Sequence, residues 1–125
     1  IHNFTQGGNT FRLALYTSSA TINKSTTQYI TTNEVANGNG YTTKGIALTN
    51  VTPALSGDTA VCDFANVSFT SASFTANGCL IFNDTATNDP SVCAIAFGGD
   101  KTVTNGTFTI EFPAADASNA ILRIA

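Results

Sequence analysis

The sequence predicts an all-β domain, built as an antiparallel two-sheet sandwich of the jelly-roll or immunoglobulin-like type with about seven to eight strands. Short segments in which apolar and polar residues alternate recur along the chain. Turn residues separate these segments at intervals of about 8–12 residues, a spacing typical of sandwiches and barrels. No segment of the 125 residues sustains the apolar period of an α-helix.

The clearest strand is expected at residues 107–113. Apolar residues occupy one face of this segment and polar residues the other: Phe108, Ile110 and Phe112 against Thr107, Thr109 and Glu111. Because side chains alternate across an extended chain, this pattern predicts a strand with one buried and one solvated face. The turn-rich residues 98–106 lead into it.

The first strand is expected at residues 11–17, with its apolar side chains toward the core. A polar connection follows at residues 18–40, and a connection of this length is usually functional or wraps a sheet edge. Within it, Asn33 is expected to cap a short helical turn among residues 26–35.

The same alternation places further strands at residues 41–51, 59–64, 67–69, 73–75, 78–82, 92–97 and 120–124. Gly45 is expected to form a bulge in the first of these, and Pro53 to mark the following turn. In the second, Ala60, Cys62 and Phe64 are expected to face the core. The continuous apolar run 78–82 predicts a central strand covered on both faces, joined by a loop at residues 83–90 to its hairpin partner 92–97.

The length and composition indicate one domain, residues 1–125, with residues 1–10 expected as an extended N-terminal arm. Charged residues make up only 10% of the chain, so Thr, Asn and Ser must supply the polar surface. An uncharged surface of this kind fits a protein that resides in an assembly. The five Lys and Arg residues are spread thinly under a net charge of −3, which argues against nucleic-acid binding. No apolar run approaches the roughly 20 residues of a membrane helix.

The three cysteines, Cys62, Cys79 and Cys93, lack the paired spacing of a metal site. The simplest interpretation is three small buried apolar residues. The alternatives are one disulfide with a free thiol, and a zinc site completed by His2.

No residue pattern points to catalysis, and no cofactor is predicted. His2 is the only histidine, and it stands at the start of the chain, where an exposed side chain is expected. Most of the eight acids fall in expected turns, and Asp63 and Glu111 are expected to point away from the apolar strand faces. The oxygen-rich segment 83–89 lacks the acid spacing of an EF-hand loop, so a solvated loop is expected there rather than a Ca²⁺ site.

Four phrases of the sequence stand out when they are taken in order: FRLALYTSSAT at 11–21, TNEV at 32–35 followed by GYT at 40–42, VCDFA at 61–65, and GGDK at 98–101 leading into TFTIEFP at 107–113. In this order they resemble a family of small structural proteins of tailed bacteriophages and prophages. The resemblance runs from Phe11 to Ile124. It implies a virion protein without enzymatic activity, most readily a decoration or cement protein on the outer surface of the head. The implied partners are the major capsid protein and further copies of this chain, as a homotrimer.

Ile1, Phe4 and Tyr29 are the expected contact residues, because they are large apolar groups outside the expected strands. The alternative for each is packing against the domain's own sheet. The alternative function is a phage tail or receptor-binding module that uses the loop 83–90, and a small hydrolase based on Asp63 or Glu111 ranks last.

Overall fold

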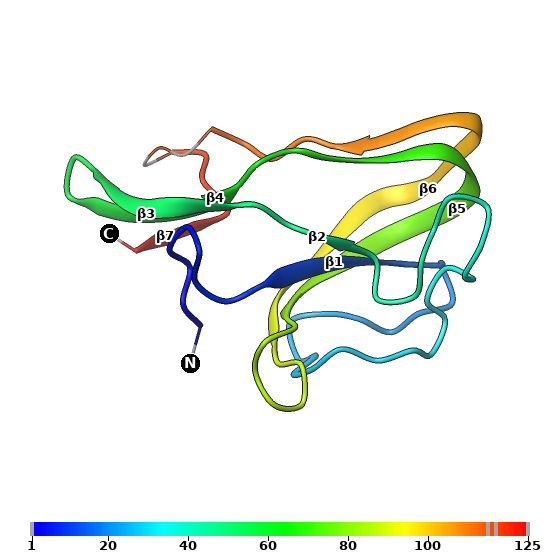
Figure 1. Cartoon of the computed structure of the whole chain (residues 1–125), viewed down its shortest axis with the longest axis horizontal. Coiled ribbons are helices and arrows are strands. Elements are labelled where there is room, and N and C mark those ends of the chain that lie inside the picture. Colours follow the sequence, from blue (N-terminus) through cyan, green and yellow to red (C-terminus); the bar gives the residue numbers. More distant parts are fainter. Residues whose placement is uncertain (1, 115, 117, 125) are drawn as a thin grey trace.

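The computed structural model describes residues 2–114, 116 and 118–124, and within them every regular element is a strand. The strands are β1 (Phe11–Tyr16), β2 (Ile46–Ala47), β3 (Asn50–Ser56), β4 (Thr59–Phe64), β5 (Val67–Asn83), β6 (Ser91–Ile110) and β7 (Leu122–Ile124). They form two antiparallel sheets, a four-stranded one in the order β2-β1-β5-β6 and a three-stranded one in the order β3-β4-β7 (Figure 1). The predicted all-β class is confirmed.

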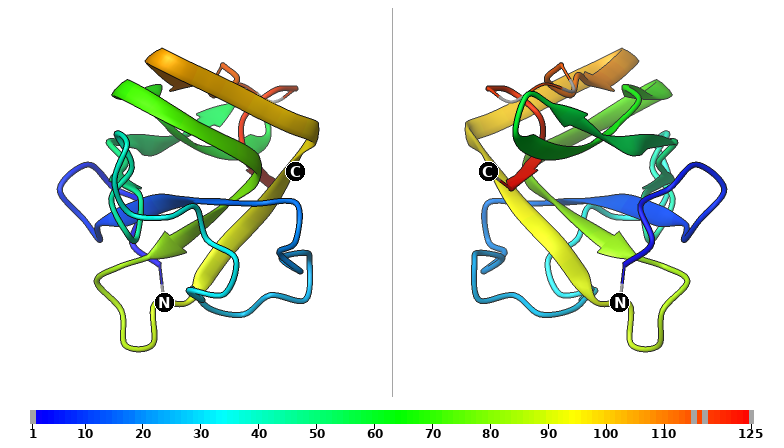
Figure 2. Two further views of the ribbon diagram at one scale, coloured as in Figure 1. Left: turned by 90° about the vertical axis from the view of Figure 1, so that its right-hand side faces the viewer. Right: turned by 90° about the vertical axis from the view of Figure 1, so that its left-hand side faces the viewer.

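The fold is built around one long, bent hairpin. Strands β5 and β6 span 17 and 20 residues, so the segments expected separately at 67–69 and 73–75 belong to a single strand. Ala76 pairs with Lys101 whereas Gly78 pairs with Ala96, so residues 97–100 oppose Asn77 alone. A bulge bends the strand that carries it. The two halves of the hairpin therefore fold toward each other (Figures 1 and 2).

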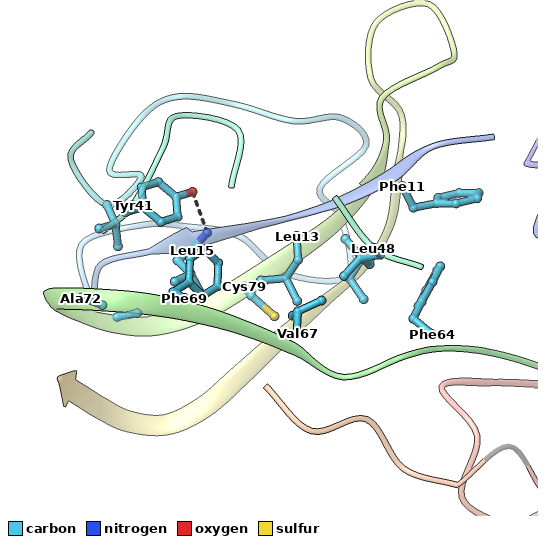
Figure 3. Packing of buried hydrophobic residues seen from close by; sticks show 13 residues of the cluster. Phe11, Leu13, Leu15, Tyr41, Leu48, Phe64, Val67, Phe69, Ala72 and Cys79 are labelled. Carbon is cyan, nitrogen blue, oxygen red and sulfur yellow. Dashed lines mark hydrogen bonds between the residues drawn. The ribbon is translucent and has the colours of Figure 1, made fainter. Parts of the chain in front are cut away.

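The core fills the space inside this bend. Apolar side chains of β1 and β5 meet there with residues from the long connection and from β4, and many of them are drawn in Figure 3: Phe11, Leu13, Leu15, Val35, Tyr41, Leu48, Phe64, Val67, Phe69, Ala72, Ala76, Cys79 and Ile81. The alternating pattern of residues 107–112 is confirmed. Phe108, Ile110 and Phe112 pack against this core, and the intervening polar residues are exposed.

A second cluster covers the other face of β1 and β5. Ala14, Tyr16, Leu80 and Phe82 are fully buried there under side chains of the connection 18–40. The prediction that residues 78–82 form a central strand covered on both faces is therefore confirmed. The connection has no helical turn at residues 26–35, because Asn33 has a left-handed backbone (φ 61°) and the next residue bridges to β1.

The orientation predicted for residues 59–64 is wrong. In β4 the inward residues are Val61 and Asp63, at 3% and 4% exposure, while Ala60 is exposed. Phe64 is buried because it lies at the end of the strand, where its ring packs against Phe11. Asp63 accepts a hydrogen bond from the Phe64 amide, and burial raises the pKa of its carboxyl.

Three smaller expectations also change. Residues 41–51 carry only the short β2 and the start of β3, with Gly45 in a turn before β2 rather than in a bulge. Pro53 lies inside β3, at a bulge of an outer strand, where its missing amide costs no ladder bond. Residues 2–10, expected as an extended arm, close into a loop through hydrogen bonds between Asn3 and Asn9.

Candidate interaction surface

The half-buried Glu34 carboxylate joins three residues of the long connection and of the turn before β2. It accepts hydrogen bonds from the hydroxyls of Tyr29 and Tyr41, each at 2.5 Å, and from the Lys44 amide at 2.8 Å. Tyr41 is 2% exposed, and its oxygen also accepts the Leu15 amide of β1 at 3.0 Å (Figure 3). This cluster, which we call the Glu34 latch, ties the long connection to the edge of β1. The polar groups of this cluster are hydrogen-bonded to one another, as in a network that stabilises a fold.

Burial raises the pKa of all three tyrosines of the chain, and the bonds to Glu34 add to the effect for Tyr29 and Tyr41. Because the unfolded pKa is about 10, the native state favours the neutral phenols and loses stability as the pH rises above that value. We expect no tyrosinate absorbance at 295 nm in the native protein at about pH 11, and its appearance only with alkaline unfolding. Ordinary titration near pH 10 with native circular dichroism would contradict the latch.

A second polar cluster fixes the loop 83–90. The Lys44 ammonium lies 3.0 Å from an Asp84 oxygen and 2.8 Å from an Asp89 oxygen, and the two bonds raise its pKa. The same ammonium lies 5.6 Å from the centre of the Tyr29 ring. A single protein cation therefore bridges both acids of this oxygen-rich segment and balances one of their two charges. No group of three His, Cys, Asp or Glu side chains that could hold a metal occurs in the described residues.

The residues weighed for catalysis are in dissimilar surroundings. Asp63 is buried in β4, whereas Glu111 is exposed beside β6. His2 is half-buried rather than exposed; its ring packs near Phe11, and its Nδ1 lies 3.1 Å from the Asn83 amide nitrogen. Neither a carboxylate pair nor a nucleophile with a base is assembled by these three side chains.

An apolar groove of about 890 Å³ lies on the open side of the bent hairpin. Its walls come from both halves of β6 and from the segment that follows them: Ile95, Phe97, Phe108, Ile110, Phe112 and Ile121. Lys101 lies at the bend, and Glu111 directly follows the end of the strand. Strand β6 is the last strand of its sheet, and the groove is lined by consecutive residues along it, Phe108 to Ile110. An apolar hollow beside an unpaired strand edge suits an extended protein segment.

The thiols of Cys79 and Cys93 also line this groove, and all three cysteines are free. Cys79 pairs with Ile95, and Ile81 with Cys93, so the two cysteines are diagonal neighbours. Diagonal neighbours lie about 7–8 Å apart, beyond the reach of a disulfide. Burial raises the pKa of Cys79 to about 12 and that of Cys93 to about 11, so both thiols stay protonated.

Two of the three predicted contact residues pack inside the domain. The Phe4 ring stacks on Phe11 with centroids 4.7 Å apart, and the Tyr29 ring stacks on Phe82 at the same separation. Both side chains remain half-exposed. Ile1 lies outside the described residues. The groove itself was not predicted, because most of its walls are residues of β6 whose burial the bend leaves incomplete.

Comparison of the chain with protein family models, with curated proteins and with solved structures found no match in any of the three. Within the described residues, none of the elements is a helix that could cross a membrane.

Proposed function

We propose that this protein is a non-enzymatic structural component of a tailed-phage virion, a decoration or cement protein on the outer surface of the head. The observation that carries the proposal is the apolar groove beside the edge of β6. Together with the charge-poor surface, it offers a place for another protein segment. The partners we propose are the major capsid protein and further copies of this chain.

The resemblance of the sequence to small phage structural proteins supports this proposal. The polar groups of two clusters support it too, because they bond within the domain. The Glu34 latch, and the cluster of Lys44 with Asp84 and Asp89, both hold the domain's own loops. A compact body with internally bonded polar groups suits a cement protein, which must resist unfolding while it gains affinity from many weak contacts. The finer fold that we propose is a small β-sandwich, in which the bent hairpin supplies strands to two layers.

Copy number and position in intact particles test this proposal. We expect the chain at high copy on the head exterior, and we expect heads stripped of it to burst at a lower temperature. Ile110→Asp in the groove should reduce incorporation, because it places a charge on the apolar wall. Thr107→Asp, on the exposed face of the same strand, is the matched control and should incorporate normally.

A copy number matching a tail ring or fibre would contradict the head assignment and favour the alternative, a tail or receptor-binding module. That role would use the loop 83–90, which has no aromatic residue to stack on a sugar. Because Ile110→Asp also carries a folding risk, Ile121→Asp, outside the strands, serves as a second groove variant. Normal incorporation of both groove variants would show that the groove is not the contact.

A further inference from the structure

The three-stranded sheet presents an apolar face that the domain itself leaves open. Leu55 pairs with Ala60, and Cys62 pairs with Leu122, so these four side chains share one side of the sheet. Leu55 is 76% exposed and Ala60 is exposed, while Cys62 and Leu122 are half-exposed. The inward side of β4 instead carries Val61 and the buried Asp63. Apolar residues on the open side, with an acid on the buried side, indicate that another chain covers this sheet.

The same sheet forms an arm. The β3–β4 hairpin projects from one end of the long axis, and the bend of the β5–β6 hairpin lies at the opposite end (Figure 1).

The groove and the tip of the arm match in charge as well as in polarity. Lys101 is exposed at the bend, at one end of the apolar groove. Asp58 is exposed in the turn of the β3–β4 hairpin, three positions after Leu55. In the described part of the chain, the ion pairs involve neither Asp58 nor Lys101. The arm therefore carries an acid, Asp58, close to the apolar Leu55. The groove carries a base, Lys101, at the end of its apolar walls, so the two surfaces are complementary.

We propose that the β3–β4 hairpin of one copy docks in the groove of a second copy, with Leu55 among its apolar side chains and Asp58 beside Lys101. Because tip and bend lie at opposite ends of the molecule, the contact is head-to-tail. Such a contact closes into a ring when the rotation between copies permits and otherwise extends into a chain. This inference deepens the proposed function, on which it rests, by naming the occupant of the groove.

Sedimentation of the full chain across micromolar to millimolar concentrations tests the docking. We expect the mass to rise above the 12.9 kDa of one chain as the concentration increases. Leu55→Thr should weaken association at least tenfold. Val51→Thr is the matched control: Val51 is 39% exposed on the same strand but shares the side of Asp63, so association should be unchanged. A monomer at every concentration, or equal effects of both variants, would overturn the proposal.

A charge exchange identifies the site of docking. Asp58→Lys and Lys101→Asp should each weaken association about tenfold, since each brings like charges together. The double variant restores an opposite pair and should recover most of the loss. Failure of the double variant to recover association would overturn the groove as the site. These measurements use isolated protein, so a negative result would contradict self-association but not head decoration. A copy number typical of a tail component would contradict head decoration but not self-association.

Discussion

Gly45→Ala is expected to prevent folding. A Cβ atom at this position would lie 1.8 Å from the Leu13 carbonyl oxygen and 2.9 Å from the Ala14 Cα, both backbone atoms of β1. Backbone in a central strand cannot move aside without breaking the ladder to β5. The residue also has φ +73°, where an L side chain costs about 1–2 kcal/mol. The close approach also allows the Gly45 carbonyl to accept a hydrogen bond from the Arg12 guanidinium at 2.8 Å.

Gly57→Ala is the matched control for this variant. Gly57 has φ +61° in the β3–β4 turn, and a Cβ there would meet nothing within 4 Å. It should therefore cost only the conformational term of about 1–2 kcal/mol. We expect Gly57→Ala to be folded and slightly less stable in urea, and Gly45→Ala to be unfolded or insoluble, since domains are stable by only about 5–15 kcal/mol. Similar unfolding curves for the two variants would contradict the close packing of Gly45 on β1.

The fold class and most strand positions could be predicted from the sequence because they depend on local alternation. Thr107 to Phe112 shows how well this works, since each predicted face is the observed one. The hairpin 78–97 was likewise predictable from an apolar run, a polar loop and a second apolar run. In each case neighbouring residues decide both the strand and its covered face.

The features that could not be predicted from the sequence depend on contacts between distant segments. In β4, alternation favours the side of Ala60 and Cys62, yet the domain buries Val61 and Asp63. If a second copy covers the Ala60 side, the alternation reports burial in the assembly rather than in the monomer.

The turn residues 98–106, expected to lead into a strand, lie inside β6. Gly98 and Gly99 belong to the four residues opposite Asn77, so the sequence signals an irregularity there, but not that one continuous strand bends at it.

The Glu34 latch was missed for a related reason. Its members are spread from residue 15 to residue 44, and none of them forms a recognisable motif. The sequence placed Tyr29 outside the strands correctly, but exposure does not follow when a ring can stack on Phe82. A single acid within a long polar connection was the only available hint.

Glu34→Ala is expected to destabilise the domain by about 3–5 kcal/mol, because each buried donor left without an acceptor costs about 1–3 kcal/mol. It leaves the hydroxyls of Tyr29 and Tyr41 and the Lys44 amide without their acceptor. The cost is large because Tyr41 is 2% exposed, so water cannot easily replace the lost partner. We expect a much lower midpoint in urea, together with early hydrogen exchange of the Leu15 amide, which Tyr41 holds in place.

Two variants separate the latch from a general effect of losing an acid. Glu111→Ala removes an exposed acid that follows β6 and lies outside the latch, and it should change stability by less than about 0.5 kcal/mol. Glu34→Gln keeps one carbonyl acceptor but loses the charge, so its loss should be intermediate, about 1–2 kcal/mol. The order Glu111→Ala, Glu34→Gln, Glu34→Ala is the expected result. Equal stability of Glu34→Ala and Glu111→Ala would show that backbone hydrogen bonds and apolar contacts hold the long connection to β1 without the Glu34 carboxylate.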